Sequence, residues 1–344
     1  MKLSIIIPVY NEINCLERFT NNLMDSFYNQ DVEYIFVNDG STDGSTEWLI
    51  NYKKNYLSKY PNNNFILINL KKNMGKGFAL IKGLELSDGD YILFQDSDLE
   101  LDPKDSLEMF DIIKENTDMK VLFGSRFISG KLRSNKNFLN ELIVKFNTII
   151  FNILYRQSIS DLHCGTKIIS KEVMNKIKLT IKDFGIEIDM ASQIAKNKFQ
   201  IYEYGISYFS RTILEGKKIT WIDGILSYFY LFKTRFIDND ISILLSIFYS
   251  IIYMVFVATY FGMGIGKSII IIIFLIIGCF IGLYKKLFTS SLVFLSIYFG
   301  SLFSEGNGKI YTVLVGFLLG MYLSSKLSKK LNSITNNKFI KFFV

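Results

Sequence analysis

Histidine and cysteine are scarce in this 344-residue chain, which has one histidine and three cysteines. Cys15, Cys164 and Cys279 lie far apart in the sequence and form no CxxC pair. One histidine beside one cysteine cannot complete a tetrahedral zinc site. The sequence therefore argues against a disulfide framework or a zinc–thiolate centre and favours a reducing, cytoplasmic setting. His163 itself is interpreted as part of a structural turn.

Dense runs of basic residues are also missing, although the formal net charge is +7. Lysines in the first 240 residues are interleaved with Asp and Glu, and the others flank apolar segments. This pattern fits a membrane surface better than a nucleic-acid groove, so no nucleic-acid partner is expected. The apolar stretch 1–9 is not expected to be a signal peptide, because it is short and Glu12 follows it closely.

Charge is nearly absent from residues 241–325, and this absence predicts a membrane region. Four uncharged stretches follow one another there, at 241–261, 268–284, 287–304 and 310–325. Crossing a bilayer takes about 20 apolar residues. Each Leu, Ile or Phe favours insertion by roughly 0.3 to 0.6 kcal/mol, against about 3 kcal/mol for one charge. We therefore predict two membrane hairpins; the alternative is a set of buried core helices.

Basic residues around these stretches predict their orientation. Several lysines and arginines precede the first stretch, lie between the second and third, or follow the fourth, whereas the other connections carry one lysine each. The positive-inside bias then places both the preceding domain and the C-terminus in the cytoplasm. The aromatic segment before the first crossing predicts an interfacial amphipathic helix. The expected parts are a catalytic domain at 1–218, this helix at 219–240, the membrane region at 241–325 and a cytoplasmic tail at 326–344.

Strand-like apolar runs alternate with helical patterns in the first half of the chain. The expected strands are at 3–9, 34–37, 65–70, 91–94 and 121–123, with helices at 17–27, 46–56 and 77–86. This alternation predicts an α/β domain whose mostly parallel sheet is covered on both faces. Ligands of such sheets bind outside the carboxyl ends of the strands.

Polar residues gather at four of these strand ends: YNE at 10–12, NDGSTDG at 38–44, QDSD at 95–98 and GSR at 124–126. Each one alone could be ordinary turn or helix-cap chemistry, but four together predict a ligand site. Asp96 and Asp98 would repel each other unless a cation lay between them. Mg²⁺ takes carboxylate and phosphate oxygens, so a divalent metal clamping a nucleotide diphosphate would satisfy both residues.

The motifs SIIIPVYNE, VNDGSTDGS, NMGKGFAL, QDSDLELDP and GSRF follow one another as in family 2 glycosyltransferases with the GT-A fold, which the chain resembles over about residues 3–235. DLHCGTK, FGIEIDM and RTILEGKKITWIDG further resemble the polyprenyl-phosphate branch, the dolichol-phosphate mannose and glucose synthases. The resemblance implies a Rossmann-like GT-A domain that uses Mg²⁺ or Mn²⁺. It also implies inverting transfer of a hexose from a GDP-mannose or UDP-glucose type of donor to polyprenyl or dolichyl phosphate.

The resemblance implies roles for individual residues. The implied nucleotide-sugar contacts are Pro8, Tyr10, Glu12, Val37, Asp39, Lys76, Asp96, Ser97, Arg211 and Lys217. The implied metal ligands are Asp96, Asp98 and Glu100. Arg211 and Lys217 would neutralise the diphosphate leaving group. Arg126, with Arg133 as a second candidate, would bind the acceptor phosphate, since the planar arginine fork bonds two phosphate oxygens at once.

Asp98, Arg126, Arg211 and Asp189 are the implied catalytic residues. Glu187 and Asp189 match an acidic pair where many relatives place a catalytic base. We expect a base to matter little here, because a phosphate acceptor is already anionic. The strongly apolar residues 137–155 either face the lipid chain of the acceptor or belong to the core.

Two other functions stay open. One is a processive or glycan-directed membrane polysaccharide glycosyltransferase, which is disfavoured because residues 218–224 lack the QxxRW pattern that such enzymes carry. The other is a flippase of lipid-linked sugars, or a scaffold with an inactive transferase domain. Transporters usually keep ionisable residues inside their spans, and the predicted spans have none. The sugar, the polyprenol length and a homo-oligomeric state also stay open.

Overall fold

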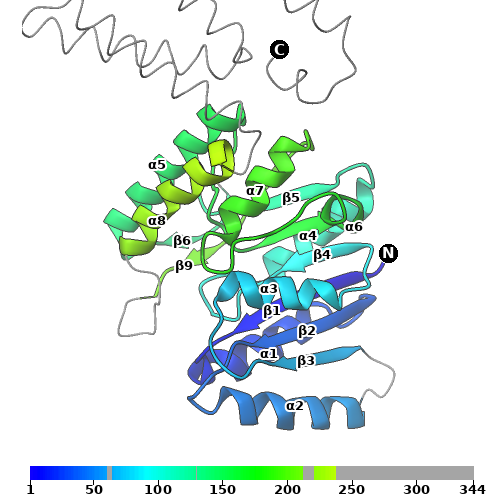
Figure 1. Ribbon diagram of the computed structural model, residues 1–344. Coiled ribbons are helices and arrows are strands. Elements are labelled where there is room, and N and C mark those ends of the chain that lie inside the picture. The colour runs from blue at the N-terminus through cyan, green and yellow to red at the C-terminus, as the bar shows by residue number, and fades with distance from the viewer. Residues whose placement is uncertain (60–63, 129, 212–220, 238–344) are drawn as a thin grey trace, which may run out of the picture. The chain divides into compact units, whose positions relative to one another are not determined.

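The computed structural model describes residues 1–59, 64–128, 130–211 and 221–237 (Figure 1). The four predicted membrane stretches and the C-terminal tail therefore lie outside the described residues, and so does Lys217. The chain divides into two units, Met1–Arg235 and Phe236–Val344, and nearly all described residues belong to the first.

A seven-stranded sheet forms the centre of the first unit. Its strands in chain order are β1 (Leu3–Val9), β2 (Val32–Asn38), β3 (Phe65–Asn69), β4 (Tyr91–Phe94), β5 (Val121–Ser125), β7 (Lys167–Ser170) and β8 (Tyr202–Gly205). Their order across the sheet is β3-β2-β1-β4-β7-β5-β8. Neighbours run parallel except at β7, which lies antiparallel to both β4 and β5. The predicted mostly parallel sheet is confirmed. Two short parallel strands, β6 (Arg133–Ser134) and β9 (Tyr208–Phe209), form a second sheet.

Helices cover both faces of the large sheet (Figure 1). They are α1 (Ile13–Ser26), α2 (Ser45–Lys59), α3 (Lys76–Glu85), α4 (Pro103–Glu115), α5 (Phe138–Tyr155), α6 (Lys171–Met174), α7 (Ile186–Lys196) and α8 (Trp221–Phe232), and a π-helical turn at Lys233–Ile237 follows α8. The expected α/β domain is therefore present, and the sequence pattern had located its first three helices.

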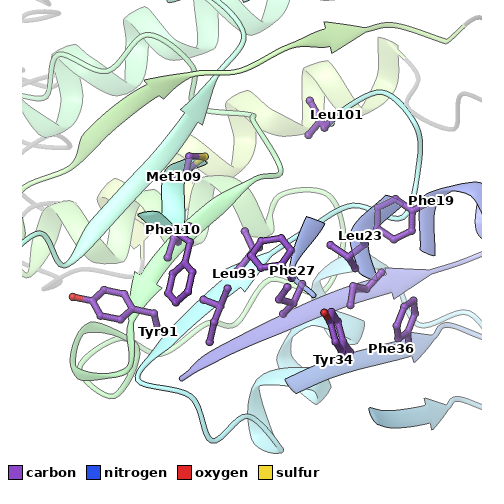
Figure 2. Packing of buried hydrophobic residues seen from close by; sticks show 14 of the residues in the cluster. Phe19, Leu23, Phe27, Tyr34, Phe36, Tyr91, Leu93, Leu101, Met109 and Phe110 are labelled. Carbon is purple, nitrogen blue, oxygen red and sulfur yellow. The ribbon is translucent and has the colours of Figure 1, made fainter. Parts of the chain in front are cut away.

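Alternate residues of the central strand β1 belong to different cores. Ile5 and Ile7 join the cluster that holds Phe19 of α1 and Phe110 of α4, as Figure 2 shows for the two aromatic rings. Ile6 joins the opposite cluster, which contains residues of α3, α5 and α7. Burial of a side chain of this size stabilises the fold by roughly 1.5 to 3 kcal/mol. A strand that is buried on both faces explains the uninterrupted apolar run at the N-terminus.

Helices α5 and α8 lie side by side (Figure 1). They approach closely where Gly224 meets Ile143, since a Cβ at position 224 would lie 3.0 Å from Ile143 Cγ2. Phe146 and Tyr228 add an edge-to-face contact with ring centroids 5.9 Å apart. Both helices also carry exposed large apolar side chains, namely Phe138, Leu139, Leu142, Phe146, Ile149 and Ile153 on α5 and Leu226, Phe229 and Phe232 on α8.

Helix α5 has buried residues, which belong to the core, and exposed apolar residues, for which contact with a lipid chain stays a prediction. Its residues Asn147, Thr148, Phe151 and Tyr155 are buried, while the apolar side chains named above are exposed. Among the described residues, α5 is the helix that is long and apolar enough to cross a membrane, judged by length and composition alone.

Candidate active site

Two adjoining cavities open at the carboxyl ends of the strands. Their linings share Lys76, Asp96, Asp98, Glu100 and Phe184. The first cavity extends over the ends of β1 and β2 and the loop before α3. The second cavity extends beneath α5 and α8. The shared residues therefore form the boundary between a site on the sheet and a site beside the helix pair.

The first cavity gathers most of the predicted nucleotide-sugar and metal residues. Its lining includes Pro8, Tyr10, Glu12, Asp39, Lys76, Asp96, Ser97, Asp98, Glu100 and Arg211. Val37 needs a correction, because its side chain is fully buried in the core against α3 and lines neither cavity. It lies within β2, where alternate side chains point to opposite faces of the sheet rather than to its edge.

Asp39 holds the loop that borders the first cavity. Its two carboxylate oxygens accept hydrogen bonds from the backbone N–H groups of Met74 (2.7 Å) and Gly75 (2.9 Å). Burial raises the pKa of Asp39 in spite of these two bonds. Since each carboxylate oxygen has a second lone pair, Asp39 can still accept a bond from a ligand.

Arg211 joins three acidic side chains at the first cavity. Its Nη1 donates to Glu12 (2.9 Å) and its Nη2 to Asp98 (3.0 Å), while its Nε lies 3.8 Å from Glu100. Its backbone N–H also donates to Glu100 (2.8 Å). Burial, together with the nearby charges of Asp96 and Glu100, raises the pKa of Asp98 to about 7. The positive guanidinium thus offsets part of the negative charge of Glu12, Asp98 and Glu100.

Lys76 neutralises the other side of this cluster. Its Nζ lies 2.7 Å from Asp96 Oδ1 and 3.0 Å from Glu187 Oε1. Burial opposes the charge of Lys76, but the two carboxylates outweigh it and raise the pKa of this lysine. Glu187 also pairs with the fully buried Lys167, which donates to the carbonyl of Cys164 as well. Opposite charges therefore alternate from Asp96 to Lys167.

The carboxylates that face both cavities suit a hard divalent cation. Within the described part of the chain, no group of three or more His, Cys, Asp or Glu side chains is already arranged around a metal position. Asp96, Asp98 and Glu100 instead meet the cations Lys76 and Arg211. The donors are all oxygens, and burial together with the neighbouring carboxylates raises the pKa of Asp98, so the residues fit Mg²⁺ or Mn²⁺.

Arg126 lines the second cavity and also a third, smaller one together with Arg133. Its Nε and Nη2 donate to the two oxygens of Asp161 at 2.7 and 2.8 Å. Asp161 thus occupies the paired donors Nε and Nη2, the kind of arginine fork that was predicted to bind a phosphate. Arg133 pairs with Glu141. The two arginines line the same cavity, each held by a carboxylate, and their role in binding an acceptor phosphate stays a prediction.

Of the predicted acidic pair, Glu187 is the residue at the site. It lines the second cavity, whereas Asp189 is fully buried and lines neither cavity. Asp189 Oδ2 accepts from the backbone N–H groups of Thr180 (2.6 Å) and Ile181 (3.1 Å). Positions two apart on a helix differ by about 200° in direction, so both carboxylates cannot face one cavity. The environment of Asp189 is that of a residue anchoring the loop before α7.

Several lining residues had no predicted role. Gly165 supports Asp96, since a Cβ at position 165 would lie 2.2 Å from Asp96 Oδ2. Gly165 belongs to the motif DLHCGTK and Phe184 to the motif FGIEIDM, so the resemblance of these motifs to the family could have indicated both residues. His163, interpreted as part of a turn, lines the second cavity 3.2 Å from Asn147 Nδ2, and burial lowers its pKa to about 4.

Comparison with known proteins identifies the family. The model of glycosyl transferase family 2 matches residues 4–178. The chain belongs to glycosyl transferase family 2. Its predicted resemblance to the dolichol-phosphate branch is also confirmed. A dolichyl-phosphate beta-glucosyltransferase of Dictyostelium discoideum is 29% identical over 230 residues, which is 63% of this chain and 68% of that protein.

A dolichol-phosphate mannosyltransferase of Pyrococcus furiosus is 29% identical over 223 residues, which is 64% of this chain. This match spans 61% of the archaeal protein, less than two thirds of its length. Among solved structures, glucosyl-3-phosphoglycerate synthase of Mycobacterium tuberculosis in complex with UDP has a TM-score of 0.51 at 16% identity, covering 68% of this chain and 79% of that one. The shared architecture confirms the predicted GT-A fold.

Proposed function

We propose that this glycosyltransferase moves a single hexose from a GDP-mannose or UDP-glucose type of donor to polyprenyl or dolichyl phosphate, with inversion. The observation that carries the proposal is the pair of cavities that meet at Asp96, Asp98 and Glu100. One cavity holds the motifs expected for the nucleotide, and the other lies beneath helices with apolar outer surfaces. The names of the two relatives support the same acceptor class.

In the first cavity, the nucleoside would lie near Tyr10, Glu12 and Asp39. The diphosphate would lie near Lys76 and Arg211, whose charges offset the negative charge that develops on the leaving group. Asp96, Asp98 and Glu100 would hold Mg²⁺ or Mn²⁺, which supplies further stabilisation of the departing diphosphate. Arg211 is already beside Asp98, so it needs to move little to reach a phosphate bound there.

In the second cavity, the acceptor phosphate would lie near Arg126 and Arg133. One of its oxygens attacks the anomeric carbon of the hexose, the new C–O bond forms on the opposite face, and the bond to the diphosphate breaks. The nucleoside diphosphate leaves with the bonding electron pair. The attacking oxygen is already anionic, so no side chain has to remove a proton, which agrees with the buried position of Asp189.

The outer face of α5 and α8 is the part of the described fold that suits a membrane surface. Its exposed apolar side chains include Phe146 and Phe229, and Lys145 on α5 is a charge that anionic headgroups would attract. We propose that this face contacts the bilayer and that residues 241–325 span it, with the catalytic domain and the C-terminus in the cytoplasm. The acceptor phosphate would then reach the second cavity from the headgroup region.

The test is transfer of radiolabelled sugar into a butanol-extractable lipid. Full-length protein in detergent receives dolichyl or a shorter polyprenyl phosphate, Mn²⁺ and a panel of UDP- and GDP-sugars in turn. We expect label with one donor, its loss in Asp98→Ala, and its retention in Asp111→Ala, which removes a carboxylate paired with Lys114 on α4. Metal-dependent nucleotide binding without label in any lipid would overturn the proposal in favour of a polysaccharide acceptor.

A further inference from the structure

Lys76 is in a position to neutralise Asp96 before any metal binds. We propose that Lys76 is a mobile counter-ion: it holds Asp96 in the metal-free protein, gives Asp96 up when the metal and nucleotide bind, and then binds the diphosphate while Glu187 keeps it in place. This inference rests on the proposed function, because it assumes that Asp96 contacts a divalent metal and that a nucleotide diphosphate occupies the first cavity.

The backbone around Lys76 fixes where its side chain starts. Lys76 is the first residue of α3 and lies between Gly75 and Gly77. A Cβ at position 75 would lie 2.4 Å from the carbonyl oxygen of Lys182, and one at position 77 would lie 2.4 Å from that of Ile181. Both glycines are therefore needed for the start of α3 to pack on the segment before α7. This packing brings Lys76 next to Glu187, at the beginning of α7.

Lys76 and a metal would compete for the same carboxylate. The ammonium group lies 2.7 Å from Asp96 Oδ1, within the distance of a charge-assisted hydrogen bond. A divalent cation on that oxygen would repel the ammonium, so Lys76 has to leave Asp96. Because Lys76 lines both cavities, it can turn toward a diphosphate without crossing the core.

Glu187 can keep hold of Lys76 throughout this change. One oxygen of Glu187 faces Lys76 and the other pairs with Lys167, which is fully buried. Lys167 keeps Glu187 neutralised whenever Lys76 moves, so no carboxylate is left buried without a partner charge. Among the described residues, Asp96 rests on Gly165 and pairs with Lys76 but with no second lysine. Asp96 is therefore the carboxylate that can exchange Lys76 for a metal.

Lys76→Met should have opposite effects on metal binding with and without nucleotide. Mn²⁺ binding to the full-length protein in detergent is measured by electron paramagnetic resonance, first alone and then with UDP or GDP, whichever the wild type binds. Without nucleotide, the substitution removes the competitor for Asp96, and Mn²⁺ affinity should rise about tenfold, the size expected for one charge-assisted hydrogen bond. With nucleotide, the substitution removes a ligand of the diphosphate, and Mn²⁺ affinity should fall below that of the wild type.

Lys82→Met is the matched control, because Lys82 belongs to the same helix and pairs on the surface with Glu85. It should leave both affinities unchanged, and Lys76→Arg should keep the wild-type difference between them. If Lys76→Met changes the two affinities in the same direction, or leaves the nucleotide-free affinity unchanged, Lys76 does not exchange Asp96 with the metal. These titrations do not depend on the acceptor, so failure of lipid glycosylation in the wild type would refute the proposed function without deciding this question.

Discussion

Alanine at position 165 should disable the site without unfolding the domain. The Cβ of such an alanine would lie 2.2 Å from Asp96 Oδ2 and 2.9 Å from Asp96 Cγ. The backbone of Gly165 is not in the left-handed region, so alanine can adopt the same conformation. The clash is with one side chain, and that side chain is the carboxylate predicted to bind metal.

The size of the effect follows from this geometry. Ordinary contact begins near 3.4 Å, so the carboxylate must retreat by more than 1 Å from its position at 2.2 Å. This movement disturbs the 2.7 Å contact with Lys76 and shifts a predicted metal ligand. A 1 Å misplacement in an active site can lower the rate by about 100-fold. Asp96 is a partly exposed side chain that can move, so we expect the free energy of unfolding to change by less than about 1 kcal/mol.

The assay combines three measurements on full-length Gly165→Ala in detergent: Mn²⁺ affinity, kcat/KM for sugar transfer to the lipid phosphate, and Tm. The control is Thr166→Val in the same turn, because the buried Thr166 Oγ1 has no hydrogen-bond partner among the described residues and its loss should be tolerated. We expect about 100-fold lower kcat/KM for Gly165→Ala only. Wild-type Mn²⁺ affinity and kcat/KM in that variant would refute the idea that Gly165 sets the position of Asp96.

Three further substitutions test other parts of the site. Asp189→Asn should lower the free energy of unfolding by about 1 to 3 kcal/mol, since the fully buried Asp189 accepts from the backbone N–H groups of Thr180 and the buried Ile181; complete loss of turnover with intact donor binding would instead identify it as a base. The one histidine of the chain, observed by NMR of ¹³C-histidine-labelled protein with a histidine-free tag, should titrate near pH 4. The unfolded chain takes up this proton near pH 6.5 and the folded chain only near pH 4. The free energy of unfolding should therefore fall by about 3 kcal/mol as the pH drops from 6.5 to 4. His163→Gln should remove this part of the decrease. A resonance that titrates near pH 6.5 would contradict the buried environment of His163. Arg126→Lys keeps the charge but loses the guanidinium, whose Nε and Nη2 hold Asp161 while Nη1 can donate to the acceptor, so KM for the lipid phosphate should rise about tenfold while KM for the nucleotide sugar stays the same; an equal change in both constants would place Arg126 elsewhere in the reaction.

The sequence predicts best those strands whose apolar runs end in polar residues, because this pattern is local in the chain. Strand β1 was predicted to the residue, because an apolar run ends abruptly in polar residues there. The residues at the ends of β1, β2 and β4 gather at one cavity because parallel strands end at the same edge of the sheet. A local pattern together with one topological rule was sufficient for most of the first cavity.

Long-range pairing is what the sequence could not show. Strand β7 carries Lys167, whose charge predicts a position on the surface. Lys167 is nevertheless fully buried, because Glu187 supplies the opposite charge. The antiparallel insertion of β7 between β4 and β5 depends on pairing over many residues and leaves no periodic signal. The sequence also could not show that Glu187, and not Asp189, lines the cavity, because this depends on the direction of each side chain on α7.

The alternation of charge around the site explains how one fold can keep so many carboxylates close together. Glu12 follows β1 and Asp98 follows β4, and Arg211 bridges the two, so a cation connects two strand ends that would otherwise repel each other. Lys76 does the same between Asp96 and Glu187. Both cations lie in the cavity predicted to receive a metal and a diphosphate, whose charges are opposite to one another. A metal can therefore take over the carboxylates while the diphosphate takes over the two cations, and the net charge that the fold must accommodate changes little as the donor binds.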